Sequence, residues 1–318
     1  MPLITEQSAS FTVFICRETP CGPRADERLP GSTQASVRYR RARPRRRAPA
    51  APGIQRGLPA QGPHRRADLP PGTDIRRARR TVAVARWLES AAYPAVRVAE
   101  VDVDQPIVTN GYVVTFWQAI SDDGDQYAST LEIAEVLRKL HQLTAPEDLQ
   151  LPPLAPFANA AQRIDANNWL SLGDRSFLTA TLSAMRDGYE NLEFVLPRGV
   201  IHGDASVGNV LRDSHGNPVV IDLDGFAIGP REWDLALTAI YYDSFGWHTR
   251  EEYQEFARVY GFDIMRWPGY PVMRSVREFL MVTWVIQKAA ESDQAAAEAR
   301  KRISALRTGA SRRDWQPY

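Results

Sequence analysis

The sequence is poor in lysine, in cysteine and in long apolar runs. Three of its 39 basic residues are lysines, Lys139, Lys288 and Lys301, so no lysine precedes position 139. The two cysteines, Cys16 and Cys21, are too few for a disulfide framework, and with one nearby histidine they make a poor zinc site. No apolar run approaches the ~20 residues of a membrane-spanning helix, and the start lacks the pattern of a secretory signal. We therefore expect a cytoplasmic protein with no membrane partner.

Charge is divided unevenly along the 318 residues. Residues 1–80 contain 17 Arg against 6 Asp and Glu, a net charge of +11. Residues 81–318 contain 22 Lys and Arg against 32 Asp and Glu, a net charge of −10. The formal total of +1 therefore averages two segments of different composition, and we place a boundary near residue 80.

The first of these segments lacks the pattern of a folded domain. Residues 17–80 contain ten prolines and seventeen arginines, without a helical or strand period of apolar residues. Such a segment buries too little apolar area to offset its ordering entropy, so we predict that it is disordered. Three interpretations are open: a basic arm that binds nucleic acid or anionic surfaces by counterion release, an inert tail, or an out-of-frame translation of a GC-rich gene. Shifted GC-rich codons yield mostly Arg, Pro, Ala and Gly, which favours the third.

From residue 81 onward the apolar spacing is that of a folded domain. Capping boxes at Ser129 and Thr249 each predict the start of a helix, and Gly261 stands where a helix ends. The other predicted elements are a helix over 81–92, strands over 96–103 and 112–117 around an Asn110-Gly111 turn, a loop at 122–125, a helix over 174–192, a strand-rich stretch over 199–222 and a helix over 272–291.

The strand-rich stretch carries side chains suited to metal and hydroxyl chemistry. An apolar strand leads into His202-Gly203-Asp204, and Asn209 follows five residues after Asp204. A polar turn reverses the chain and a second apolar run ends in Asp222, so two carboxylates and a carboxamide leave the ends of adjacent strands. Hard oxygen ligands of this kind suit Mg²⁺, which completes its shell with water and phosphate oxygens. A further carboxylate near the metal can orient a hydroxyl and accept its proton.

Each of these residues alone is an ordinary turn residue, but their joint spacing is far more specific. It resembles the catalytic loop of the aminoglycoside phosphotransferase family, whose members share the protein-kinase-like fold. The resemblance covers roughly residues 81–290 and implies an α+β fold with two lobes. Residues 81–120 would form the remainder of the N-terminal lobe and the linker strand, and residues 121–318 a mostly helical C-terminal lobe with the catalytic loop and the acceptor pocket. The implied cofactors are ATP and Mg²⁺.

The resemblance implies a role for each matching residue of the reaction centre. Asp204 would be the catalytic base, and Asn209 and Asp222 would hold Mg²⁺. Asp224 would be an auxiliary contact to metal or phosphate.

The resemblance also implies supporting residues. His202 would orient the catalytic loop by hydrogen bonding, and Asp234 would brace that loop from behind. The linker residues Phe116, Trp117 and Gln118 would contact the adenine through backbone groups.

The sequence departs from the family in its N-terminal lobe. The fold needs a strand–loop–strand over the phosphates and a cationic side chain, normally lysine, on the following strand. Residues 17–80 occupy that window without an alternating apolar pattern and without a lysine. An arginine would supply the charge but not the same geometry.

The implied function is phosphoryl transfer from ATP to a hydroxyl of a small molecule, such as an aminoglycoside, an amino alcohol or a sugar. The net charge of −10 over residues 81–318 suits a cationic acceptor. Two alternatives are a catalytically impaired kinase-like protein, either a pseudokinase or the product of a damaged gene, and a nucleic-acid-binding protein acting through residues 1–80. The aromatic residues that either line the acceptor pocket or belong to the core are Trp169, Tyr241, Tyr242, Phe245, Trp247, Trp267, Tyr270 and Trp284.

Overall fold

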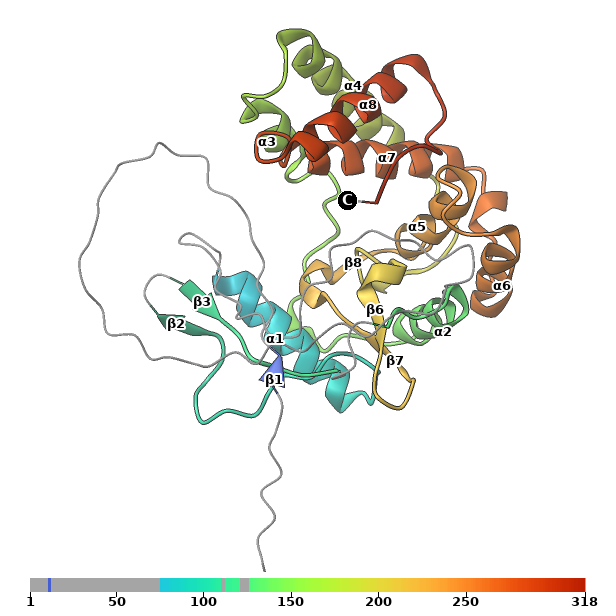
Figure 1. Ribbon diagram of the computed structural model, residues 1–318. Coiled ribbons are helices and arrows are strands. Elements are labelled where there is room, and N and C mark those ends of the chain that lie inside the picture. The colour runs from blue at the N-terminus through green and yellow to red at the C-terminus, as the bar shows by residue number, and fades with distance from the viewer. Residues whose placement is uncertain (1–10, 13–74, 110–111, 121–125, 318) are drawn as a thin grey trace, which may run out of the picture.

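The computed structural model describes residues 11–12, 75–109, 112–120 and 126–317. Its elements form a small group near the N-terminus and a larger, mostly helical group (Figure 1). The small group pairs β2 with β3 and β1 with β4, both antiparallel. Its elements are β1 (Phe11–Thr12), α1 (Ile75–Ser90), β2 (Ile107–Thr109), β3 (Tyr112–Val114) and β4 (Trp117–Gln118).

The larger group contains two short antiparallel strand pairs, β5 with β8 and β6 with β7. Small antiparallel sheets among many helices agree with the predicted α+β class. Its elements are α2 (Thr130–Leu140), η1 (Glu147–Leu149), α3 (Ala160–Asp165), α4 (Leu172–Glu190), β5 (Arg198–Ile201), η2 (Val207–Asn209), β6 (Val210–Arg212), β7 (Pro218–Val220), η3 (Leu223–Gly225), β8 (Ala227–Pro230), α5 (Glu232–Asp243), α6 (Arg250–Tyr260), η4 (Ile264–Arg266), α7 (Tyr270–Ile286) and α8 (Asp293–Thr308).

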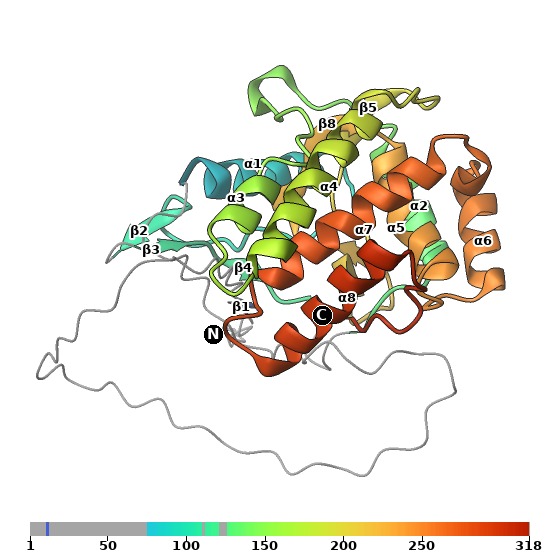
Figure 2. The ribbon, with the colours of Figure 1, turned by 90° about the horizontal axis from the view of Figure 1, so that it is seen from above.

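In Figure 1, strands β6, β7 and β8 lie between α1 on one side and α2 on the other. Helices α3, α4, α7 and α8 gather at one end of the molecule, whereas α1 and the β2–β3 pair lie at another (Figures 1 and 2). One continuous apolar core nevertheless joins the two groups, because it includes Leu88 of α1 as well as Phe279 of α7. The loops that follow β5 and β7 therefore leave strands that pack against the same apolar core.

Helix α1 begins at Ile75, so the prediction that residues 75–80 are disordered is wrong. Ala78, Val82 and Leu88 are buried on one face of the helix, while Arg76 and Arg79 project into solvent. The small Ala78 is the only buried residue of the first turns, which explains why no apolar period was visible there. The prediction of disorder for residues 17–74 concerns residues outside those that the structure describes.

The strand predicted over 96–103 does not form. Ala95 and Val98 make only isolated bridges, and the strand of this region is β2, which begins at Ile107. Two backbone bonds join residues 97–99 to 116–118, but the Gln105 side chain takes two further groups: its Nε2 donates to Ala99 O at 2.8 Å and its Oε1 accepts from Phe116 N at 2.6 Å. The predicted turn at 110–111 and loop at 122–125 lie outside the described residues, although β2 and β3 pair on either side of that turn.

Local signals for helix ends are confirmed. Ser129 and Thr249 form complete capping boxes, and Gly261 ends α6 in the left-handed conformation with φ 92°. The helix predicted over 272–291 ends earlier, at Ile286, and a separate helix α8 follows it. Helix α8 went unpredicted because its buried face is largely alanine, which gives a weak apolar period.

Candidate active site

Two loops meet because of how their flanking strands pair. The loop after β5 carries Asp204, and the loop after β7 carries Asp222. Strands β6 and β7 pair with Val210 opposite Val220, and β5 and β8 pair with Ile201 opposite Ala227. The ends of these strands therefore deliver both loops to one place, as the sequence predicted.

The backbones of the two loops touch at their glycines. Gly203 has φ +87°, and a side chain there would meet the Gly225 carbonyl oxygen at 2.4 Å. A side chain at Gly225 would in turn meet the His202 carbonyl oxygen at 2.8 Å. Only glycine meets both requirements at position 203, the positive φ and the close approach.

Asp204 stands at the mouth of this loop pair, with its side chain 60% exposed. The Asn209 amide Nδ2 donates to the Asp204 carbonyl oxygen at 2.7 Å and to its Oδ2 at 3.3 Å. The structure thus brings together the catalytic base and one metal ligand that the sequence proposed. A third partner, the Arg277 guanidinium, lies 3.3 Å from Asp204 Oδ1 and was not predicted.

His202 links the two loops from a buried position. The Asp204 backbone N donates to His202 Nδ1 at 3.2 Å, and His202 Nε2 lies 2.8 Å from the Ile221 carbonyl oxygen. An acceptor at Nδ1 assigns the ring proton to Nε2, which then donates to Ile221. His202 therefore orients the start of the catalytic loop against the chain that leads into Asp222.

Asp234 lies fully buried at the start of α5 and holds the loop from behind. Its carboxylate accepts from His202 N at 2.7 Å, from Gly203 N at 2.9 Å and from His141 Nε2 at 3.1 Å. Burial acts to raise the pKa of Asp234, but the hydrogen bonds that its carboxylate accepts from His141 and from the His202 backbone outweigh it and lower the pKa. An ionised carboxylate therefore fixes the backbone just before Asp204.

Asp222 adopts the left-handed conformation, with φ 57°. Part of its side chain remains open to solvent, yet dense surrounding protein and the neighbouring carboxylates of Asp224 and Asp204 raise its pKa well above the usual range. Arg77 of α1 opposes that rise and forms an ion pair with Asp224. When all three of these carboxylates are ionised, they outnumber the two nearby guanidinium groups, Arg77 and Arg277, so the site carries a net negative charge.

That negative charge fits a divalent cation. Asn209 and Asp222 offer hard oxygen donors from two loops that are in contact, which is the sparse ligand set that Mg²⁺ accepts in phosphoryl-transfer sites. Within the described residues, no group of three or more His, Cys, Asp or Glu is arranged to hold a metal ion by itself. The chemistry of the donors therefore suits a metal that phosphate oxygens and water help to coordinate.

The linker residues expected to contact adenine are engaged with other parts of the protein. Phe116 N donates to Gln105 Oε1, Phe116 O accepts from Ala99 N at 2.9 Å, and Gln118 N donates to Arg97 O at 2.9 Å. The Trp117 side chain is buried in the core. The contact of this linker with adenine stays a prediction.

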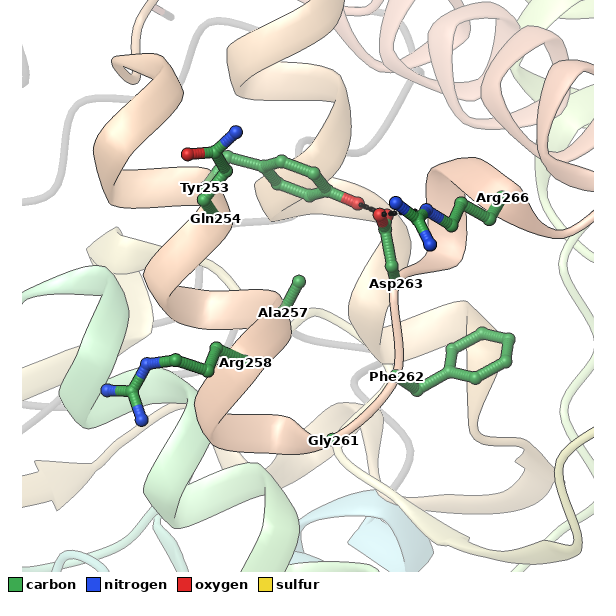
Figure 3. Close-up of a pocket in the computed structure, with 8 residues that line it drawn as sticks. All are labelled: Tyr253, Gln254, Ala257, Arg258, Gly261, Phe262, Asp263 and Arg266. Carbon is green, nitrogen blue, oxygen red and sulfur yellow. Dashed lines mark hydrogen bonds and ion pairs between the residues drawn. The ribbon is translucent and has the colours of Figure 1, made fainter.

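The aromatic residues proposed for core or pocket differ in burial. Phe245, Trp267 and Tyr270 belong to the buried core, whereas Trp284 of α7 is 39% exposed. A shallow hollow of about 450 Å³ lies elsewhere, between α6 and η4. Three of its polar side chains pair with one another, because Asp263 accepts from the Tyr253 hydroxyl and forms an ion pair with Arg266 (Figure 3). We assign no function to that hollow.

Among the described residues, no helix has both the length and the apolar character needed to cross a membrane.

Residues 54–279 of the chain match the phosphotransferase enzyme family. The chain belongs to this family. The match begins inside the arginine-rich segment, so the family likeness reaches further toward the N-terminus than the boundary near residue 80.

Relatives of this phosphotransferase family member include small-molecule kinases. A probable ketoamine kinase from Lactiplantibacillus plantarum is 29% identical over an alignment of 172 positions, which covers 48% of this chain and 58% of the relative. The matched part thus spans little more than half of that relative's length.

Solved structures share the fold at low sequence identity. An amicoumacin kinase in complex with AMP-PNP and Ca²⁺ is 10% identical with a TM-score of 0.57, and the match covers 77% of this chain and 81% of that one. The choline kinase LicA from Streptococcus pneumoniae is 14% identical with a TM-score of 0.51, over 74% of this chain and 84% of that one. These likenesses confirm the expected kinase-like fold.

Sequence reasoning missed three residues of the site: Arg77, His141 and Arg277. Each lies on a helix or at its end, far along the chain from the carboxylate that it contacts, at separations of 147, 93 and 73 residues. A single arginine or histidine on an amphipathic helix carries no local signal of such a partner. Only the folded arrangement assigns them to the site.

Proposed function

We propose that this phosphotransferase family member transfers the γ-phosphate of ATP to a hydroxyl of a small molecule. One observation carries the proposal: Asp204, Asn209 and Asp222 leave two loops in mutual contact, and the buried Asp234 and His202 hold those loops. This is the arrangement needed to align a hydroxyl with a phosphate beside a metal-binding carboxylate.

The residues divide the work by position. Asp204, whose side chain is 60% exposed, accepts the proton of the acceptor hydroxyl and orients its oxygen toward the phosphorus. Asn209 and Asp222 would hold Mg²⁺, which supplies charge neutralisation at the phosphate oxygens when bound. Asp234 keeps the loop backbone in place through its bonds to His202 N and Gly203 N.

Nucleotide use is supported by the relatives of known structure. A spectinomycin phosphotransferase in complex with ADP and spectinomycin shares the fold at 16% identity and a TM-score of 0.50, over 71% of this chain and 78% of that one. The amicoumacin kinase carries an ATP analogue. ATP is therefore the donor that we propose here.

The acceptor that we propose is a cationic small molecule with a free hydroxyl. The net charge of −10 over residues 81–318 would draw such a molecule toward the helical lobe. Ketoamines, amino alcohols and aminoglycosides share this chemistry, and the relatives act on members of these classes by their names. We expect one of these classes to be the acceptor.

The test is replacement of the proposed base. Asp204→Asn should lower kcat for MgATP-dependent ADP release by at least ~10²-fold, because a positioned base contributes about that much to proton transfer. The assay uses spectinomycin, choline and a ketoamine in parallel as acceptors, with MgATP affinity measured by calorimetry. Affinity should change by less than about 2-fold, since Asp204 is not a proposed nucleotide ligand.

Asp187→Asn is the matched control, because Asp187 is an exposed carboxylate of α4 outside the site. It should retain wild-type turnover. An Asp204→Asn variant with undiminished turnover would remove Asp204 from this role. MgATP binding by the wild type without turnover of any acceptor would instead support the catalytically impaired alternative.

A further inference from the structure

Arg277 joins the catalytic loop from a helix that the resemblance did not implicate. It lies on α7, where its side chain is only 9% exposed, and its guanidinium Nη2 donates to Asp204 Oδ1 at 3.3 Å. Its Nη1 also approaches the carbonyl oxygen of Gly203 at 3.4 Å. A buried cation of α7 therefore contacts both the side chain of the proposed base and the backbone just before it.

The guanidinium of Arg277 is itself held by an aromatic platform. Its carbon atom Cζ lies 4.3 Å from the centre of the Trp233 ring, a distance typical of cation–π stacking. The Trp233 indole Nε1 donates to the same Gly203 carbonyl oxygen at 2.7 Å. Trp233 thus anchors the loop with its edge and supports Arg277 with its face.

We propose that Arg277 is a positioning residue that fixes the orientation of the Asp204 carboxylate for phosphoryl transfer. This rests on the proposed kinase function. The two carboxylate oxygens have different partners, because Oδ1 meets Arg277 and Oδ2 meets Asn209 Nδ2. Asn209 would hold a metal ion through its amide oxygen, and Arg277 holds Oδ1 of Asp204, which leaves Oδ2 as the oxygen that accepts the proton of the acceptor hydroxyl.

Physical reasons favour the fixing of the Asp204 carboxylate by Arg277. The Asp204 side chain is mostly exposed, so without a partner it would populate several rotamers. The planar guanidinium stacked on Trp233 is preorganised and loses little freedom when it binds the carboxylate, which a flexible lysine does not reproduce. Misplacement of a reacting group by about 1 Å can cost ~10²-fold in rate.

The experiment compares Arg277→Gln and Arg277→Lys with the wild type in MgATP-dependent ADP release, with spectinomycin, choline and a ketoamine as acceptors. We expect Arg277→Gln to lower kcat by about 10²-fold while the KM for ATP stays within about 2-fold. Arg277→Lys should retain an intermediate kcat, since it keeps the charge without the stacked fork. Thermal unfolding identifies any variant that fails to fold.

Chemical rescue separates positioning from general stability. Millimolar guanidinium chloride should restore part of kcat to Arg277→Ala, whereas NaCl at the same ionic strength should not. Arg274→Gln is the matched control, because Arg274 lies one turn away on α7 and pairs with Asp243 rather than with the loop. It should leave kcat unchanged.

The outcomes distinguish this inference from the function on which it rests. A wild type that turns over no acceptor overturns the proposed function, and the positioning role with it. An active wild type together with Arg277→Gln at full kcat overturns the positioning role alone. So does an equal loss of kcat in Arg274→Gln, or a rescue that NaCl reproduces.

Discussion

Among single residues, Asp234 does most to hold the site together without touching the proposed substrates. Its buried carboxylate accepts from His202 N, Gly203 N and His141 Nε2. His141 Nδ1 in turn lies 2.7 Å from the Tyr260 hydroxyl, so the network extends from the catalytic loop through α2 to α6. Loss of this carboxylate should therefore weaken both folding and catalysis.

We expect Asp234→Ala to lower the free energy of unfolding by about 3 kcal/mol, because a buried ionic network loses its central acceptor. The substitution leaves the His202 and Gly203 N–H groups without a partner. Urea-induced unfolding at pH 7 measures the loss. Asp234→Asn keeps the shape and one acceptor oxygen and should lose less, and equal stability of Asp234→Ala and wild type would contradict this account.

The sequence predicted individual residues unequally. Asp204, Asn209 and Asp222 were proposed together because their spacing lies within one short stretch of chain, and the structure places them on loops in contact. Arg77 and Arg277 had no such local pattern. Their roles depend on helices packing against the loops, which the residues nearby in sequence do not determine.

At the scale of elements, α2 shows how a local signal also serves long-range packing. Ser129 and Glu132 form the capping box that begins the helix. The same Glu132 carboxylate accepts from Arg212 of β6, with Nε at 3.0 Å from Oε1. The hydrogen bonds from Arg212, followed by those from Ser129, lower the pKa of Glu132 to about 2.

This shift predicts a pH-dependent contribution to stability. The pKa of Glu132 is about 2 in the folded state and 4.5 in the unfolded chain. The ionised side chain therefore stabilises the fold fully at pH values above 4.5, and this contribution is lost as the pH falls toward about 2. Glu132→Gln should keep the capping box yet lower the free energy of unfolding by roughly 1–2 kcal/mol at pH 7, a figure that allows for solvent screening at the partly exposed Arg212.

The measurement is denaturant unfolding of the wild type and Glu132→Gln at pH 7 and pH 3. The difference in stability should narrow at the lower pH. Glu135→Gln, an exposed carboxylate on the same helix, should show little difference at either pH. A gap of constant size would contradict the assigned ion pair.

Elements with local signals were predicted well, and elements without them were not. Capping boxes and the αL glycine located the ends of α2 and α6, because those interactions lie within a few residues of each other. The strand predicted over 96–103 failed, since the Gln105 side chain occupies the backbone groups that a ladder would use. One of these groups, Phe116 N, is 11 residues from Gln105 along the chain, so no local pattern predicts the contact.

At the scale of the whole molecule, the last described residues close the helical lobe. Trp315 is fully buried, 5.4 Å from the ring of Phe245, with the guanidinium groups of Arg302 and Arg312 stacked over it. These contacts connect the C-terminal segment to the residues that follow α5 and to α8.

We expect Trp315→Ala to lower the free energy of unfolding by about 3–5 kcal/mol, the usual cost of truncating a buried tryptophan. Trp284→Ala removes the same side chain from a position that is 39% exposed, and should cost less. Guanidinium-induced unfolding of both variants tests the difference. Equal losses would show that the Trp315 contacts do not hold the lobe together.

The sequence by itself determined the class of fold and led to the proposed reaction centre, because the proposed catalytic loop, the proposed metal-binding aspartate and the capping boxes depend on spacing within short stretches of chain. Tertiary structure alone decided what surrounds that centre. Arg277 meets Asp204 across 73 residues, and Arg77 meets Asp224 across 147. Contacts between residues so far apart in the sequence form only when the helices pack on one apolar core. That packing depends on many segments together, so no single segment of the sequence predicts it.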